Sequence, residues 1–278
     1  MVPPITRERM INRICPPSPP LLQHVEYLWY HEGVDSPPLR LLPDGAIELV
    51  IDLTDRPRTW RDRDLRNVRR VRGSWISGQH SFAIAVDGAV GSRMIGAHFR
   101  PGGAFPFIPG PVADLTDTVV EMDCLWGSFA DELRERLLEE PRIDAQLGIL
   151  ENALLRRAAG RLTIDRSLAY ALHWLQASPE TVTVRHAASR VGVSQKRLIA
   201  MFERRVGLKP KMFSRVMRLQ RVLRHIERAP STPWSRLAAT YGYYDQSHLI
   251  NDFTALTGLR PAEYLRDEWD ELNRVLAP

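Results

Sequence analysis

The sequence predicts an α+β protein, in which a β-rich N-terminal domain precedes an all-helical C-terminal domain. Three observations lead to this prediction: short apolar runs separated by glycine and proline before residue 111, amphipathic patterns of helical period after it, and an internal repeat near the end. The 278 residues suit two domains, because compact domains cluster near ~100–150 residues. A content of 44% hydrophobic and 26% charged residues excludes a disordered, collagen-like or coiled-coil chain.

Short strand patterns fill the first hundred residues. The run 46–53 is β-branched and follows the turn sequence Pro43-Asp44-Gly45, so we expect a strand there. The polar, arginine-rich stretch 54–72 indicates a long loop. Further strands are expected within 25–30, 39–42, 74–77, 81–86 and 92–99. Several short strands at this spacing predict a sandwich or a barrel.

Two amphipathic helices are expected at 125–139 and 144–157, where leucines recur at helical spacing. Their apolar faces have two interpretations: they cover the barrel, or they pair with a second copy of the chain and make a homodimer through 125–157. The segment 158–166 is the expected linker between an N-terminal domain at 1–157 and a C-terminal domain at 167–278.

An eight-position repeat is the strongest pattern in the sequence. Its copies are separated by 50 residues at the first two positions and by 51 at the other six, so a single residue is inserted. The first copy consists of Ala188, Gly192, Ser194, Leu198, Phe202, Gly207, Pro210 and Phe213; the second consists of Ala238, Gly242, Asp245, Leu249, Phe253, Gly258, Pro261 and Tyr264.

Each copy has the residues of a helix-turn-helix, at about 183–206 and 234–256. A small alanine lets two helices cross, a glycine makes the turn, and Ser194 or Asp245 caps the second helix. Between the copies, 211–228 contains no glycine or proline and predicts one connector helix. Its 18 residues span roughly 27 Å, close to a DNA turn of ~34 Å.

Basic charge is concentrated in the C-terminal part. Residues 1–160 carry 19 Lys and Arg against 22 Asp and Glu, a net charge of −3, whereas 161–278 carry 19 against 11, a net charge of +8. Within 185–224, twelve basic residues accompany one acidic residue. Such a stripe is typical of a surface that binds phosphates, although a solvated helix face can show the same excess.

The segment 241–249, YGYYDQSHL, resembles the signature of the AraC/XylS family of bacterial transcription regulators. The resemblance continues through Phe253, Gly258, Pro261 and Tyr264. It implies two helix-turn-helix subdomains whose recognition helices enter adjacent major grooves of double-stranded DNA, in a cytoplasmic, nucleoid-associated regulator for which RNA polymerase is a candidate partner. Arginine is common in the family where this chain has Ala200 and Asn251, so the target sequence does not carry over.

A second resemblance covers residues about 15–150. It rests on Leu42-Pro43-Asp44-Gly45, the segment 98–104 (HFRPGGA) and Leu115-Thr116-Asp117. These motifs are similar to an N-terminal domain of unassigned role that accompanies some family members. In the family at large this domain is often a cupin-like barrel, and the resemblance therefore implies a small-molecule effector or a dimer interface.

The outward faces of the second helices supply the candidate DNA contacts. The candidates for reading bases are Gln195, Lys196, Ile199, Ala200, Ser247, Ile250 and Asn251. The candidates for binding phosphates are Arg185, Arg197, Lys209, Lys211, Arg215, Arg218, Gln246 and His248. The alternative for each is a solvated helix surface.

Four aromatic residues of the N-terminal domain are candidates for an effector pocket, with a role in the core as the alternative: Tyr27, Trp29, Trp75 and Phe99. Histidines and glutamates also occur there, but their spacing fits no metal motif, so we expect neither a metal nor a cofactor.

The sequence thus predicts an effector-responsive, sequence-specific DNA-binding regulator without enzymatic activity. An architectural DNA-binding protein without a ligand is the first alternative. The second is a DNA-repair methyltransferase fused to the same module, which needs an activated cysteine, commonly next to proline and histidine. Cys15 and Cys124 lack that setting. No membrane span or signal peptide is expected.

Overall fold

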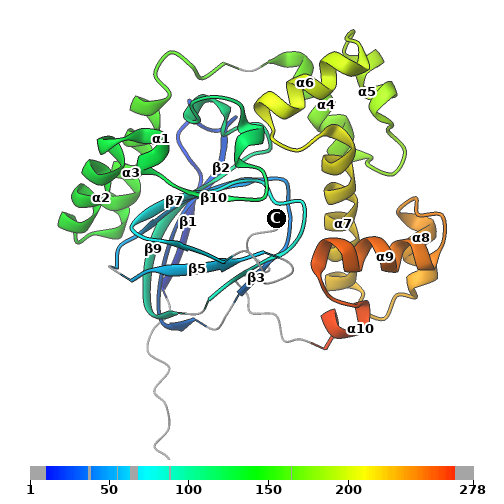
Figure 1. The fold of residues 1–278 in the computed structure, drawn as a ribbon, viewed down its shortest axis with the longest axis horizontal. Helices are drawn as coiled ribbons and strands as arrows, with labels where there is room; N and C mark the ends of the chain where they lie inside the picture. Colours follow the sequence, from blue (N-terminus) through cyan, green and yellow to red (C-terminus); the bar gives the residue numbers. More distant parts are fainter. Residues whose placement is uncertain are drawn as a thin grey trace, which may run out of the picture.

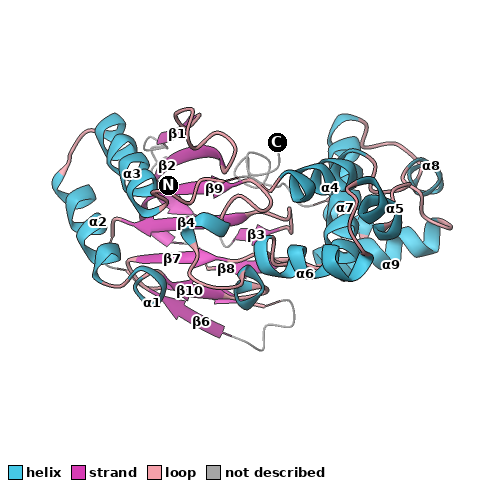
Figure 2. Cartoon of the chain, turned by 90° about the horizontal axis from the view of Figure 1, so that it is seen from above, coloured by secondary structure: helices cyan, strands magenta, loops and turns pink. Residues whose placement is uncertain are grey.

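A computed structural model describes residues 11–36, 39–54, 56–62, 68–87, 89–163 and 165–266. Two antiparallel sheets form the N-terminal part and helices form the C-terminal part, which confirms the predicted α+β fold (Figures 1 and 2). Among the described residues, no helix combines the length and the apolar character that crossing a membrane requires.

Within the described residues, ten strands form the two sheets. The larger sheet has the order β1 (Ile11–Cys15), β2 (Val25–Ser36), β9 (Ala89–Phe99), β4 (Ile47–Asp52), β7 (Ser74–Ser77) and β10 (Val119–Glu121). The smaller sheet has the order β3 (Leu39–Leu41), β8 (Ile84–Val86), β5 (Arg58–Arg61) and β6 (Val68–Val71). Neighbouring strands are antiparallel, and β4 pairs with both β7 and β9 at the centre of the larger sheet.

Alternation along β4 divides the N-terminal part into two cores. Leu49 and Ile51 face the covering helices, whereas Val50 packs with Trp60 and Trp75 between the two sheets. This two-residue period is the one expected of a strand that is buried on both faces. The residues of β4 that alternate with those of the main core therefore line the space between the sheets.

Three helices, α1 (Asp123–Trp126), α2 (Ser128–Glu139) and α3 (Ile143–Arg157), cover the outer face of the larger sheet. The first expected helix is divided, because Gly127 takes a positive φ of 61° between α1 and α2. Leu133 and Leu154 are buried in the same core as the sheet. Of the two interpretations of these apolar faces, the structure supports the covering role.

The C-terminal helices build two smaller cores along one long helix. They are α4 (Arg166–Ala177), α5 (Val184–Arg190), α6 (Gln195–Arg205), α7 (Pro210–Arg228), α8 (Trp234–Thr240), α9 (Gln246–Thr257) and α10 (Pro261–Tyr264). The first half of α7 packs with α4, α5 and α6, and the second half packs with α8, α9 and α10. Figure 1 shows α7 running between these two groups.

The prediction of a long loop at 54–72 is wrong, because β5 and β6 form a hairpin within this segment. Trp60 and Val71 point into the space between the sheets, while arginines at neighbouring positions face outward. The many arginines of this segment obscure the alternation of buried and exposed residues in the sequence. In addition, β8 begins only at Ile84 and β9 begins three residues before the expected start at residue 92.

Two glycines give opposite stability predictions. A Cβ at Gly78 would lie 1.7 Å from the carbonyl oxygen of Leu115, so Gly78→Ala should destabilise the protein by about 2 kcal/mol or more. A Cβ at Gly148 on α3 meets nothing within 4 Å, so Gly148→Ala should stabilise it by about 0.5–1 kcal/mol. Urea unfolding measures both, and equal effects would contradict this packing.

Candidate DNA-binding surface and interdomain cavity

The first helix-turn-helix consists of α5 and α6. Ser194 caps α6 by accepting a hydrogen bond from the backbone N–H of Arg197 at 3.1 Å. Val193 N–H donates to the carbonyl oxygen of Ala188 across the turn at 3.0 Å. Leu198 and Phe202 are fully buried, as the four-residue spacing predicts.

The second helix-turn-helix, α8 and α9, repeats the same contacts. Asp245 caps α9 by accepting from His248 N–H at 2.7 Å, and Tyr243 N–H donates to Ala238 at 3.0 Å. Leu249 and Phe253 are fully buried. The capping and burial predicted from the repeat are therefore confirmed in both copies.

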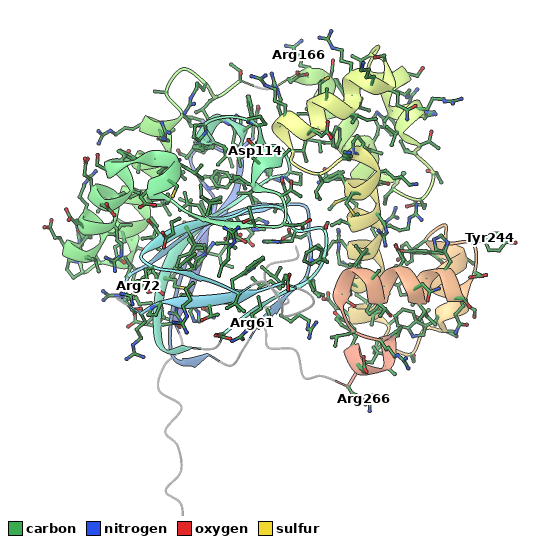
Figure 3. All side chains as sticks on the ribbon, in the orientation of Figure 1. Arg61, Arg72, Asp114, Arg166, Tyr244 and Arg266 are labelled. Carbon is green, nitrogen blue, oxygen red and sulfur yellow. The ribbon has the colours of Figure 1, made fainter. Side chains whose placement is uncertain are left out.

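The candidate base-reading residues lie on the outer faces of α6 and α9. Five of the seven are exposed, namely Gln195, Lys196, Ala200, Ser247 and Asn251, and the remaining two, Ile199 and Ile250, are half-buried. Tyr244, which precedes the cap of α9, is 93% exposed and projects from the edge of the molecule opposite the sheets (Figure 3). Tyr244 is not among the candidates that the sequence indicates, although its position beside the cap residue Asp245 is a visible signal.

The candidate phosphate-binding residues divide into two groups. Exposed side chains belong to Arg185, Arg197, Lys209, Lys211, Gln246 and His248. Arg215 instead forms an ion pair with the buried Asp252, and Arg218 stacks over Tyr243 at 5.0 Å and donates to Pro179 O at 3.2 Å. These two arginines connect α7 to its neighbours within the C-terminal part.

A cavity of about 220 Å³ lies between the sheets and reaches α7. Its walls come mainly from apolar side chains of both sheets, including Trp29, Trp60 and Trp75. Its remaining side is closed by Gln220, Leu223, Arg224 and Glu227 of α7 and by Tyr264 of α10. The cavity is therefore shared by the β-rich part and the helical part.

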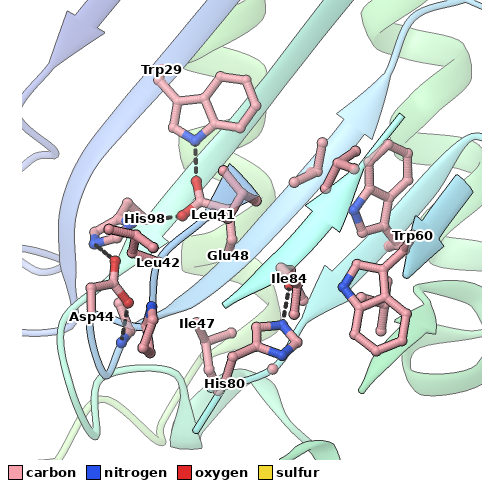
Figure 4. Close-up of a pocket in the computed structure, with 18 of the residues that line it drawn as sticks. Trp29, Leu41, Leu42, Asp44, Ile47, Glu48, Trp60, His80, Ile84 and His98 are labelled. Atoms are coloured by element: carbon pink, nitrogen blue, oxygen red, sulfur yellow. Dashed lines mark hydrogen bonds and ion pairs between the residues drawn. The ribbon is translucent and has the colours of Figure 1, made fainter. Parts of the chain in front are cut away.

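A cluster of acidic residues and a histidine forms one side of this cavity (Figure 4). His98 Nδ1–H donates to Glu48 Oε2 at 2.6 Å, Asp44 Oδ2 lies 3.8 Å from His98 Nε2, and Trp29 Nε1–H donates to Glu48. Burial of the imidazole disfavours its charge, but Glu48 and Asp44 outweigh this effect and raise the pKa of His98 to about 9. His98 is therefore an imidazolium at neutral pH.

Of the four aromatic pocket candidates, the structure places two in the cavity. Trp29 and Trp75 line it. Phe99 is fully buried on the opposite face of β9 and packs against Phe107 with ring centroids 5.0 Å apart. Tyr27 stacks on His98 at 4.7 Å and lies behind the lining. Trp60 also lines the cavity but is not among the candidates from the sequence, although its alternation with Thr59 and Arg61 on β5 is the signal that marks it.

Direct contacts join the cavity to the helices. Gln220 Nε2–H donates to Pro43 O at 2.7 Å, and Ala83 N–H donates to Leu256 O at 2.7 Å. A second hollow of about 300 Å³ shares Asp44, His98, Gln220 and Arg224 with the first and extends to α4. Within the described ranges, no group of three or more His, Cys, Asp or Glu residues is arranged to hold a metal ion.

Comparison with known proteins finds two family matches. A helix-turn-helix domain model matches residues 187–267, and a model described as a domain of unknown function, DUF6597, matches residues 13–121. No curated protein matches the chain.

Solved structures of ToxT from Vibrio cholerae are similar at low identity. A 1.65 Å structure has 8% identity and a TM-score of 0.47 and covers 86% of this chain and 97% of its own. A complex with (E)-4-(8-methylnaphthalen-1-yl)but-3-enoic acid has 9% identity and a TM-score of 0.47 and covers 85% and 96%.

The paired helix-turn-helix units and the matched domain define a DNA-binding protein. Within the matched span, the segment 241–264 carries the residues that resemble the AraC/XylS signature.

The buried His98 predicts a pH-dependent stability. A folded pKa of about 9 against 6.5 in the unfolded chain contributes up to about 3 kcal/mol, which is fully present below pH 6.5 and is lost as the pH rises through 9. The free energy of unfolding of the wild type relative to His98→Gln should fall across this window in urea titrations. His186→Gln, an exposed change on α5, is the control. A constant difference from pH 6.5 to 9 would contradict the assignment.

Proposed function

We propose that α6 and α9 enter adjacent major grooves and read bases there. The exposure of Gln195, Lys196, Ala200, Ser247 and Asn251 supports this proposal, as does the length of α7, whose 19 residues span about 28 Å. The exposed cations Arg185, Arg197, Lys209 and Lys211 would contact phosphates, and Gln246 and His248 would do so at the N-terminus of α9.

We further propose that the regulator responds to a small-molecule effector in the interdomain cavity. One observation carries this proposal: four residues of α7, the helix that joins both helix-turn-helix units, line the cavity. A ligand that packs against Leu223 and Arg224 would favour one position of α7 over another, and differential binding of this kind is what shifts a conformational equilibrium. The division into domains at 158–166 is part of the same proposal.

The two alternative functions require different features of the structure. An architectural protein without a ligand needs no cavity at α7, and the described cavity favours the effector-responsive regulator. A methyltransferase needs a thiolate, but burial raises the pKa of Cys15, and a hydrogen bond to Asp123 raises that of Cys124. A homodimer through 125–157 and a contact with RNA polymerase remain predictions.

Asn251→Ala tests base reading. The Asn amide can donate to N7 and accept from N6 of adenine, so its loss should cost about 1–3 kcal/mol at the cognate site and relax the preference at one base pair. Binding-site selection at two salt concentrations measures both effects. Asn152→Ala, the same change at an exposed position on α3, is the control.

Arg197→Ala provides the contrast on α6. Losing a phosphate contact should weaken binding to all sequences alike and lower the salt slope by about one unit. An unchanged base preference in Asn251→Ala would make α9 a backbone anchor and leave base reading to α6.

The fragment 163–278 separates DNA binding from the effector response. It contains both helix-turn-helix units and α7, so it should bind DNA as a monomer with a steep salt dependence. A metabolite that raises the melting temperature of the full chain should change the DNA affinity of the full chain by about 5- to 150-fold, the usual range of allosteric coupling. It should leave the fragment unaffected. A response of the fragment, or a full chain that no metabolite affects, would count against the effector role.

A further inference from the structure

Two hydrogen-bond donors of β5 in the cavity wall have no acceptor among the described residues. Arg58 and Trp60 alternate with outward residues on β5, so both side chains point into the space between the sheets. Arg58 is 6% exposed and Trp60 is 5% exposed. Neither Arg58 Nη2 nor Trp60 Nε1 finds a hydrogen-bond partner in the part of the chain that the structure describes.

Unpaired buried donors are uncommon, because each has lost its water without gaining an acceptor. On the opposite side of the same cavity, the indole of Trp29 has an acceptor, because its Nε1–H donates to Glu48. Trp60 therefore differs from Trp29 in having an indole N–H available to an incoming acceptor. Figure 4 shows Trp60 and His80 on one side of the cavity and Asp44 and His98 on the other.

His80 lies beside Trp60, with ring centroids 5.7 Å apart. Its Nε2 shares a hydrogen bond of 2.9 Å with Ser77 Oγ, and burial lowers the pKa of the imidazole to about 4. His80 therefore adds no charge at neutral pH. The polar atoms on this side that have no partner among the described residues are the indole N–H of Trp60, one guanidinium N–H of Arg58 and Nδ1 of the neutral His80.

Charge decides between a neutral and an ionised ligand. The charge of Arg58 is already matched by Asp52, which lies 2.6 Å from Arg58 Nε and is fully buried. Across the cavity, Glu48 and Asp44 share the single imidazolium of His98. On the β5 side an added carboxylate would find no unmatched cation, since Arg224 lines the cavity from α7, and a cationic ligand on the β5 side would face Arg58 and the N–H of Trp60.

We propose that this cavity binds a compact, apolar ring compound that carries one neutral hydrogen-bond acceptor, such as a ketone carbonyl, which accepts from Trp60 Nε1–H and Arg58 Nη2–H. The assignment rests on the proposed effector role of the cavity and adds the chemical class of the ligand. The volume of about 220 Å³ lies below the ~300–1,000 Å³ of sites for drug-sized ligands, so the compound is small. Tryptophans and aliphatic side chains around it supply the apolar contact.

Four probes of similar shape test the ligand class on the full chain. Acetophenone carries the neutral acceptor, ethylbenzene lacks it, benzoate is anionic and 1-phenylethylamine is cationic. Calorimetry should give acetophenone the highest affinity, at least about 10-fold above ethylbenzene, because it accepts one neutral hydrogen bond from Trp60 and one charge-assisted hydrogen bond from Arg58. Equal affinities for acetophenone and ethylbenzene, tighter binding of benzoate or of the amine, or no binding of any probe would each overturn the proposal.

Trp60→Phe removes the N–H and keeps an aromatic ring. It should lower the preference for acetophenone over ethylbenzene about 3- to 10-fold, the usual effect of one neutral hydrogen bond, because the hydrogen bond from Arg58 remains, and it should leave ethylbenzene binding unchanged. Trp29→Phe makes the same change in the same cavity at an indole whose N–H is already paired, so it should keep the preference. A preference that is undiminished in Trp60→Phe would overturn the assignment of the donor.

DNA binding distinguishes this inference from the proposed function. If acetophenone binds with the predicted dependence on Trp60 and leaves the DNA affinity of the full chain unchanged, the ligand class stands and the effector role fails. If another compound changes the DNA affinity while acetophenone does not bind, the effector role stands and the ligand class fails.

Discussion

The packing of α7 on three sides is the constraint on which the rest of the structure depends. Phe213 and Val216 complete the core of the first helix-turn-helix, and Val222 and Ile226 complete that of the second. A third face, formed by Gln220, Arg224 and Glu227, closes the cavity. A helix that is fixed on all three sides moves as a rigid body, because packed cores resist continuous deformation.

Polar contacts set the register of α7 against the sheets. Gln220 is 4% exposed and donates to Pro43, which begins the turn that carries Asp44. Asp44 in turn lies beside His98, so a short chain of contacts joins the acidic side of the cavity to the helix. Buried polar groups of this kind are costly unless they are paired, and they therefore favour one arrangement of the two parts.

The two sides of the cavity differ in how far their polar groups are satisfied. Glu48 accepts hydrogen bonds from Trp29 and His98, so these polar groups are paired without a ligand. On β5, Arg58 and Trp60 keep donors without acceptors among the described residues. This asymmetry would orient a ligand that has one acceptor, since the unpaired donors of the two sheets lie on the β5 side.

The sequence by itself determined what depends on neighbours along the chain. The glycine turns, the caps Ser194 and Asp245 and the buried pair Leu249 and Phe253 follow from spacing, because capping and helical periodicity are local. Tertiary structure alone decided which residues meet across the sheets. It placed Trp60 in the cavity and Phe99 outside it, because a strand exposes alternate residues to opposite faces and the sequence does not say which face is enclosed.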